Sequence, residues 1–303
     1  MTTGNACTVA VDLGGTHVRA ALVADDGSIL TADRRPTPRN EPTPTVIPTM
    51  VKELLALVPD GIDAPGRAVI AVPGIIDHEG GRLLAAPNIP TTWPASLHEA
   101  WLADRTGLEV SLANDADLAA VGESTFGAGR DHRDVVYVTI STGVGAGVVV
   151  AGQLVRGRLS GGELGHTVID RAAAATGGPC TVEDLGSGTA INRAAVEAGI
   201  ESQGPELAEL VRQQDPAATA VWTEAIEAVG IGIANMAWVV APQVVVVGGG
   251  VGSNGDLVLP ILRRQIDRHG PETGGSIEVV TAMLGDGAAL SGAAAWWTAV
   301  GRG

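Results

Sequence analysis

The chain has 303 residues, of which 45% are apolar and only 3% aromatic, and its formal net charge is −15. This length allows two compact lobes, because single hydrophobic cores stop growing at roughly 250–300 residues. The acidic charge argues against a nucleic acid or an anionic membrane as partner, since phosphate groups attract basic surfaces. The two cysteines, Cys7 and Cys180, cannot form a disulfide framework and fit a reducing compartment.

The N-terminal and apolar segments carry no targeting signal. No basic segment precedes an apolar stretch at the start of the chain, so a signal peptide is not expected. No uninterrupted apolar run reaches the ~18 residues that a membrane span needs. We therefore expect a soluble, cytoplasmic protein.

The predicted elements alternate between strands and helices. In the first part of the chain we expect strands at 9–11, 18–23, 67–72 and 109–112, with helices near 46–58 and at 116–123. In the second part we expect strands at 135–140, 147–150 and 244–247, with helices at 222–240, from 253 or 254 to 266, and at 288–300. This order predicts a mixed α/β fold.

Two segments of the chain, VAVDLGGTHVRAALV and VYVTISTGVGAGVVV, share one pattern. Each has an apolar strand, a short polar residue, a Gly-rich turn and a second apolar strand. The resemblance hints at an internal duplication, at lower similarity than true repeats show. A second lobe is expected to begin near Asp115.

Glycine-rich turns follow three predicted strands, after Asp12, Thr142 and Val247. Glycine permits left-handed backbone angles and close approach, so successive N–H groups can converge on an anion. After the first turn the chain alternates as a strand instead of entering a helix, which excludes the dinucleotide fingerprint, and the sequence has no GxxxxGK[ST] motif. One such turn alone is more often a plain hairpin, but three together favour nucleotide binding.

Carboxylates occur beside the first turn and after a predicted strand. Asp12 suits Mg²⁺, held directly or through water. Asn114 and Asp115 follow an apolar strand, where a strand-to-helix junction can direct side chains into a cleft. Phosphoryl transfer to an alcohol needs a carboxylate that accepts the hydroxyl proton. Taken alone, however, this pair is better explained as a helix N-cap.

Three further polar residues, Glu163, His166 and Glu183, occur close together in the sequence. Carboxylates and an imidazole suit the neighbouring hydroxyls of a sugar, since each can bridge two oxygens. The alternative is that the two glutamates are surface charges and that the histidine is a core residue with its hydrogen bonds satisfied.

These motifs together resemble the ROK (repressor, ORF, kinase) family of sugar kinases, within the actin-like ATPase superfamily. The segments VAVDLGGTHVRAAL and ISTGVGAGVVVAGQLVRG are similar to its two phosphate motifs, VVVVGGGV to its adenosine motif, and LGDGAALSGAA to its closing segment. Four other segments, AVPGIID with APNIPTTW, LANDADLAAVGE, SGGELGH and EDLGSGTAI, are similar to those that contact sugar or hold the catalytic base. The similarity covers nearly the whole chain in the family's order.

The resemblance implies an α/β fold of two actin-like (ribonuclease H-like) lobes with a cleft between them. Residues 1–114 and 288–303 would form the small lobe and residues 115–287 the large one. The residues implied to bind ATP are Asp12, Gly14, Gly15, Thr16, Thr142, Gly143, Gly145, Gly248, Gly249 and Gly250. Asp12 would also hold Mg²⁺ through water. Those implied to bind the sugar are Asn88, Asn114, Asp115, Glu163, His166 and Glu183.

The function implied by the resemblance is ATP-dependent phosphorylation of a hexose, with Asp115 as general base and the 6-hydroxyl of glucose as acceptor. An amino sugar such as glucosamine, kanosamine or N-acetylmannosamine is the alternative acceptor. A non-catalytic sugar sensor and an actin-like assembly protein are weaker alternatives, and polyphosphate as donor stays open. A homodimer is the family expectation.

The chain departs from the family in one motif. Most members carry CxCGxxGCxE, whose cysteines join the histidine of the GH pair on structural zinc. Here the cysteine positions hold Ala174, Thr176 and Thr181, while Cys180 falls on a glycine position. A thiolate site cannot form from one cysteine out of register, so we expect no structural zinc and a His166 left free for sugar. With the first strand near residue 8, a DNA-binding helix-turn-helix is not expected either.

Overall fold

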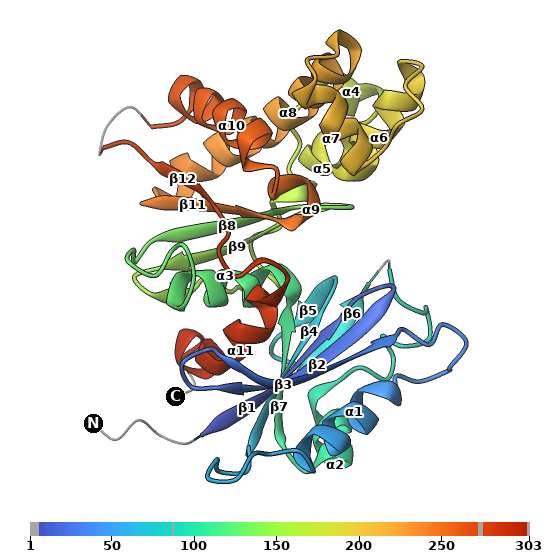
Figure 1. The fold of residues 1–303 in the computed structure, drawn as a ribbon, viewed down its shortest axis with the longest axis vertical. Helices are drawn as coiled ribbons and strands as arrows, with labels where there is room; N and C mark the ends of the chain where they lie inside the picture. Colours follow the sequence, from blue (N-terminus) through green and yellow to red (C-terminus); the bar gives the residue numbers. More distant parts are fainter. Residues whose placement is uncertain (1–5, 87, 272–274, 302–303) are drawn as a thin grey trace.

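The computed structural model describes residues 6–86, 88–271 and 275–301. Two separate five-stranded sheets build the molecule, and helices α3 (Asp115–Thr125) and α11 (Ala288–Ala299) lie between them (Figure 1). The predicted mixed α/β organisation is therefore confirmed.

The first sheet has the strand order β3-β2-β1-β4-β7. Its strands are β1 (Cys7–Leu13), β2 (His17–Ala24), β3 (Ile29–Pro36), β4 (Arg67–Val72) and β7 (Glu109–Asn114). Strand β2 is antiparallel to β1 and β3, whereas β4 and β7 run parallel to β1. Helices α1 (Val46–Leu55) and α2 (Glu99–Thr106) cover one face with apolar side chains, and α11 covers the other.

The second sheet has the order β10-β9-β8-β11-β12 and repeats this pattern of directions. Its strands are β8 (Val135–Ile140), β9 (Val144–Val150), β10 (Gln153–Leu154), β11 (Val244–Gly248) and β12 (Glu278–Thr281). Helix α3 packs on one face, while α8 (Pro216–Val240) and α10 (Gly255–His269) contribute to the core on the other. The equivalent topology of the two sheets agrees with the repeated sequence pattern.

The remaining elements are short and lie outside the two sheets. They are the hairpin of β5 (Ile75–Asp77) and β6 (Arg82–Ala85), the 3₁₀ turns η1 (Leu164–His166) and η2 (Gly285–Gly287), and the helices α4 (Arg171–Thr176), α5 (Val182–Gly186), α6 (Gly188–Glu197), α7 (Pro205–Arg212) and α9 (Gly249–Gly252). The sequence patterns predicted none of them, and most have six residues or fewer, too few for a clear period.

Helix α8 is long and apolar enough, by length and composition, to cross a membrane. More than half of its most apolar stretch is nevertheless buried inside the protein. Its residues Ile226, Val229 and Ile233, at spacings of three and four, are buried in the core of the second lobe. The composition of α8 is therefore explained by a core helix of this fold.

Helices α3 and α11 touch backbone to backbone where the two sheets approach each other. A side chain on Gly122 would collide with the Ala288 carbonyl, and one on Gly292 with the Leu118 carbonyl. The buried Glu123 adds a second link, because its carboxylate accepts N–H groups from Ala128, Met283 and Leu284 at 2.7–3.1 Å. Helix α3 is thus held from both sides, and its N-terminus lies at the end of β7.

Candidate active site

The first glycine turn joins β1 to β2, and residues that follow β3 donate hydrogen bonds to its carbonyl groups. The Thr37 hydroxyl donates to the Gly14 carbonyl at 2.7 Å, the Thr37 N–H to the Thr16 carbonyl at 2.8 Å, and the Arg39 guanidinium to the Gly15 carbonyl at 2.6 Å. The N–H groups of Gly15 and Thr16 have no partner in the described part of the chain. They are therefore available to an anion.

Asp12 stands at the end of β1, opposite Arg19 on β2. Nε of Arg19 lies 3.0 Å from Oδ2 of Asp12, and a second guanidinium nitrogen contacts the same oxygen. Oδ1 of Asp12 accepts no hydrogen bond from the residues described. The ion pair neutralises the carboxylate and leaves one oxygen for a metal-bound water.

The second glycine turn joins β8 to β9 and is held in the same way. The Gly188 N–H donates to the Ser141 carbonyl at 2.7 Å, and the Thr189 hydroxyl donates to the Thr142 carbonyl at 2.8 Å. Within residues 6–301, as far as they are described, the N–H groups of Thr142 and Gly143 make no hydrogen bond. This turn therefore also presents backbone donors to an anion.

The third glycine cluster ends β11 and opens the short helix α9. Gly249 has a φ of +84°, and a side chain on it would lie 2.5 Å from the Ile140 carbonyl, so only glycine fits. A cavity of about 450 Å³ lies between this cluster and the second turn. Its lining residues are Ser141, Thr142, Gly188, Thr189, Ile191, Asn192, Gly204, Pro205, Trp222, Gly250, Val251, Ser253 and Asn254. Its size and mixed lining suit a nucleoside.

Asn114 and Asp115 form the junction between β7 and α3. Oδ1 of Asn114 accepts the N–H groups of Ala116 and Asp117 at 2.9 and 3.3 Å, which confirms the N-cap interpretation for this residue. Its Nδ2 donates to the Gly74 carbonyl at 3.2 Å. One N–H of the Asn114 amide remains for another partner.

The Asp115 side chain reaches solvent, but many protein atoms surround its carboxylate and displace part of its hydration. Loss of hydration raises its pKa to about 6, and the nearby carboxylates of Asp12 and Glu163 add to the effect. Because the pKa lies close to neutrality, Asp115 can both accept and release a proton under ordinary conditions. That property suits a general base.

A second aspartate on the same helix, Asp117, is a feature that sequence reasoning missed. It is fully buried, and neither carboxylate oxygen has a hydrogen-bond partner among the described residues. Burial raises its pKa well above the usual range, and the carboxylates of Glu163 and Asp115 act in the same direction. The folded protein therefore keeps Asp117 protonated. Its position in the motif NDAD was the available signal.

Glu163, His166 and Glu183 come together beside the second turn. Nε2 of His166 lies 3.8 Å from Oε2 of Glu163, and the Val144 N–H donates to Oε2 of Glu183 at 2.8 Å. Burial raises the pKa of Glu163, and Glu183 raises it further. The alternative of a buried core histidine is wrong, because His166 is exposed.

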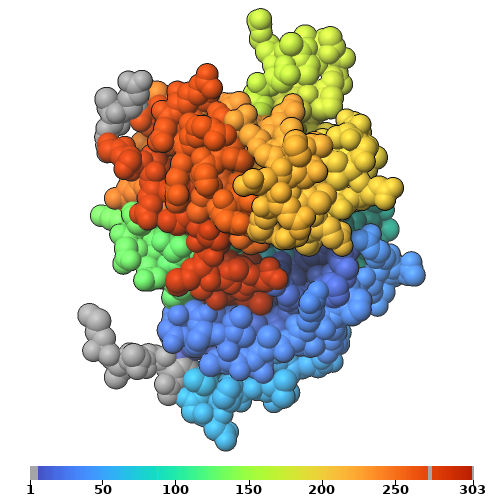
Figure 2. Space-filling view, turned by 45° about the horizontal axis from the view of Figure 1, so that its top comes forward, coloured from blue at the N-terminus to red at the C-terminus, as the bar shows by residue number. Residues whose placement is uncertain are grey.

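The segment before α5 has no cysteine cluster, and hydrogen bonds hold it in place. Thr181 and Asp184 form a capping box at the start of α5, and the Ile169 N–H donates to the Cys180 carbonyl at 2.9 Å. The described residues contain no group of three or more His, Cys, Asp and Glu side chains that could hold a metal ion. The segment around α4 projects from the surface (yellow-green in Figure 2).

Two further residues predicted for the site, Asn88 and Gly145, lie beside the first turn and the start of α3. The backbone of Asn88 lies against the first turn, since a side chain on Gly15 would come within 2.6 Å of the Asn88 carbonyl. Gly145 lies within β9 and faces Ala116 at the start of α3. The predicted residues therefore surround the two turns and the N-terminus of α3.

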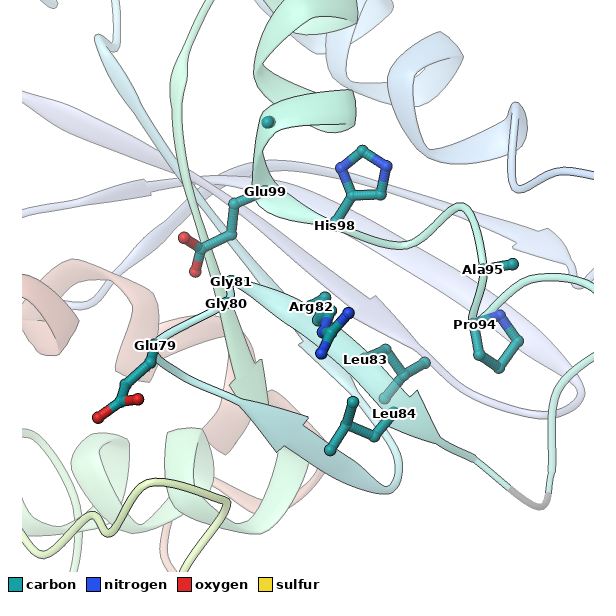
Figure 3. A pocket seen from close by; sticks show the side chains of 11 residues that line it. Glu79, Gly80, Gly81, Arg82, Leu83, Leu84, Pro94, Ala95, His98 and Glu99 are labelled. Carbon is teal, nitrogen blue, oxygen red and sulfur yellow. The ribbon is translucent and has the colours of Figure 1, made fainter.

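A second cavity, of about 530 Å³, lies away from this site (Figure 3). The β5–β6 hairpin and the start of α2 line it, and its charged residues are Glu79, Arg82 and Glu99. None of the predicted site residues contributes to it. The predicted site residues therefore lie at the two turns and not in this cavity.

Comparison with known proteins agrees with this geometry. The ROK family model matches residues 8–300. The glucokinase of Thermotoga maritima is 34% identical over 309 aligned positions, covering 94% of this chain and 95% of that protein. The structure of a ROK family glucokinase from Streptomyces griseus in complex with glucose and AMPPNP is similar with a TM-score of 0.77 and 32% identity, over 95% of this chain and 98% of that one.

A second similar structure is a candidate N-acetylmannosamine kinase from Listeria monocytogenes. Its TM-score is 0.80 at 25% identity, over 96% of this chain and 98% of that one. The expected two-lobed actin-like fold is confirmed by these similarities. The chain belongs to the ROK family, and it is a kinase.

Proposed function

We propose that this protein transfers the γ-phosphoryl group of ATP to a hexose, with the 6-hydroxyl of glucose as acceptor and Asp115 as general base. The observation that carries the proposal is the position of Asp115. Its carboxylate, with a pKa of about 6, lies in one acidic cluster with Asp12 of the first turn and with Glu163. The glucokinase of Thermotoga maritima and the glucose complex from Streptomyces griseus support glucose as the acceptor.

ATP would bind with its nucleoside in the cavity of about 450 Å³ beside residues 248–250. Its phosphates would then meet the free N–H groups of Thr142 and Gly143 on one side and those of Gly15 and Thr16 on the other. Backbone dipoles fixed in advance stabilise the charge of a moving phosphoryl group without reorganisation. The AMPPNP complex of the Streptomyces griseus relative supports this donor.

A magnesium ion would be held through water by Oδ1 of Asp12, the oxygen that Arg19 leaves free. When bound, Mg²⁺ supplies positive charge that neutralises the phosphates. Arg19 keeps Asp12 oriented through its two contacts.

The sugar would bind between the lobes, beside residues from both. Its hydroxyls would meet the side chains of Asn88, Asn114, Asp115, Glu163, His166 and Glu183. Asp115 would accept the proton of the attacking hydroxyl as the phosphoryl group moves. Closure of the lobes would exclude water that otherwise hydrolyses ATP.

The lobe boundaries that we propose follow from the two sheets. Residues 1–114 with 288–303 would move as the small lobe and residues 115–287 as the large lobe, with the α3–α11 contact as their junction. A cytoplasmic homodimer is proposed as well. The free thiols of Cys7 and Cys180 support the reducing compartment.

An amino sugar such as N-acetylmannosamine, glucosamine or kanosamine is the second candidate acceptor. One observation favours it. In place of the cysteine motif the chain carries α4 and the Thr181–Asp184 capping box on either side of Glu183, which changes the surroundings of a proposed sugar contact. The Listeria monocytogenes relative supports the same candidate.

A coupled assay of ADP release over a panel of hexoses and amino sugars tests the proposal. We expect strong turnover with glucose. Turnover confined to an amino sugar would support the second candidate. Binding of sugar without turnover of any acceptor would contradict a catalytic role. Formation of sugar phosphate over the same panel, with polyphosphate in place of ATP, tests the donor.

A further inference from the structure

Glu183 contacts the second phosphate turn directly. Oε2 of its carboxylate accepts the Val144 N–H at 2.8 Å, and a side chain on the neighbouring Gly143 would collide with the same oxygen. The Thr181–Asp184 capping box fixes the first turn of α5, which carries Glu183. The carboxylate is therefore held against the turn by its own helix.

The other carboxylate oxygen of Glu183 remains free. Oε1 accepts no hydrogen bond from the residues that the structure describes, and the side chain is half-buried. The field of Glu183 reaches Glu163, whose pKa it raises. One oxygen thus serves the phosphate turn, while the other has no hydrogen-bond partner among the described residues.

The charge of Glu183 is not neutralised by a cation. No ion pair of Glu183 exists among the described residues, whereas Asp12 at the first turn is paired with Arg19. An anionic carboxylate beside free backbone donors opposes a second anion there, because like charges repel more strongly where water is excluded. The phosphates of a nucleotide would meet this repulsion at Thr142 and Gly143.

We propose that Glu183 couples the two substrates of the proposed kinase reaction: Oε2 holds the second phosphate turn, Oε1 accepts a sugar hydroxyl, and each substrate strengthens binding of the other. A sugar hydroxyl that donates to Oε1 draws negative charge away from the turn and fixes the carboxylate. The repulsion that phosphates experience is then smaller. By linkage, bound nucleotide raises sugar affinity by the same factor.

The coupling rests on the proposed function, and it adds a positioning role for Glu183. Without sugar, the unneutralised carboxylate weakens nucleotide binding, so ATP is held poorly when no acceptor is present. When sugar is bound, the repulsion between the Glu183 carboxylate and the phosphates falls, and the hydrogen bond to Val144 already holds the turn in place. This arrangement disfavours hydrolysis of ATP by water before the acceptor arrives.

Calorimetric titration of AMPPNP with and without glucose tests the inference on the wild type and Glu183→Gln. The glutamine can still accept the Val144 N–H, but it carries no charge. We expect glucose to raise AMPPNP affinity about tenfold in the wild type, within the usual range of such couplings. In E183Q we expect AMPPNP without sugar to bind about fivefold more tightly, and glucose to change its affinity little.

A gain in affinity separates this role from a structural one, since a damaged turn would bind AMPPNP more weakly. Glu163→Gln is the matched control: it removes a carboxylate from the same cluster that makes no hydrogen bond or ion pair with the turn among the described residues. We expect it to weaken glucose binding and to leave AMPPNP binding without sugar close to wild type. If E183Q melts early, Glu183→Ala replaces it, and glucose must then no longer raise its AMPPNP affinity, because the variant lacks Oε1 as well.

Equal AMPPNP affinity of wild type and both Glu183 variants, with and without glucose, would overturn the coupling even if the wild type phosphorylates glucose. The reverse result is distinguishable. If no sugar is phosphorylated, the proposed function fails, while tighter AMPPNP binding by E183Q would still support the charge effect at the turn.

Discussion

The two phosphate turns have the same topology and differ in the charge beside them. Each joins two antiparallel strands, and each has its carbonyls held from behind by a threonine hydroxyl, that of Thr37 or Thr189. At the first turn the acid is Asp12, which Arg19 neutralises. At the second the acid is Glu183, which forms no ion pair among the described residues and accepts a backbone N–H instead.

This difference shows how a repeated backbone can serve two roles. Hydrogen bonds to the carbonyls hold both turns, and each turn leaves backbone N–H groups available to an anion. The side chains then decide what else each turn responds to. We infer that the first turn is prepared for metal and phosphate, and that the second senses the sugar.

The largest effect is expected from Asp115. Its carboxylate interacts with that of Asp12 at the first turn, and the next residue, Ala116, lies against Gly145 after the second turn. We expect Asp115→Asn to keep sugar affinity and to lower turnover at least ~10²-fold, the usual scale for a general base. Sugar affinity from titration and turnover from the coupled assay are the two measurements. Full turnover in the variant would remove Asp115 from the mechanism.

The pH dependence of the proposed reaction should follow the same carboxylate. Because Asp115 has a pKa of about 6, kcat/KM should fall about tenfold per unit below that pH, as the base becomes protonated. Glu163→Gln should move this limb to lower pH, since Glu163 raises the pKa of Asp115. A profile that is flat well below pH 6 would contradict the assignment.

The third prediction concerns Asp117 on α3 and tests whether its carboxyl group is protonated in the folded protein. Its folded-state pKa is raised, so folding loses stability as pH rises above the unfolded value of about 4, by at most about 1.4 kcal/mol per unit, until the folded pKa is reached. Asp117→Asn lacks this loss, and its free energy of unfolding should exceed that of wild type increasingly with pH. Urea unfolding at acidic and alkaline pH measures the difference. A constant difference would show that Asp117 is ionised when folded.

The smallest effect compares the two threonines directly. Thr37 is buried and Thr189 is exposed, so water can replace only the second hydroxyl. We expect Thr37→Ala to lower the free energy of unfolding by about 1–3 kcal/mol and Thr189→Ala by less than about 1 kcal/mol. Thr37→Ser, which keeps the hydroxyl, is the control. Equal costs for the two alanine variants would mean that the turns are not held as described.

Much of the fold was predictable because the central strands and long helices have clear periods. Strands β4 and β8 match the predicted residues 67–72 and 135–140, and α11 matches within one residue. Strand β3 was missed because it lies at a sheet edge and carries charged residues in place of an apolar face. Helices α4 and α5 were missed because they have six and five residues, too few for a period to develop.

The sequence allowed the residues of the site to be predicted, but not the contacts that hold them in place. The glycine turns and Asp115 stand in recognisable motifs. Thr37 and Arg39, which donate hydrogen bonds to carbonyls of the first turn, lie outside those motifs. They reach the turn because the chain after β3 returns to it. The contact of Glu183 with Val144 joins residues 39 positions apart. Such contacts follow from tertiary packing, which a single sequence does not specify.

The central claim is that phosphates lie between the two turns with an acceptor hydroxyl beside Asp115. A crystal structure with glucose and AMPPNP bound tests it most directly. The account predicts a γ-phosphate between residues 14–16 and 142–143, and the sugar 6-hydroxyl within about 3.2 Å of the Asp115 carboxylate. A nucleotide bound away from both turns, or an acceptor oxygen out of reach of Asp115, would contradict it.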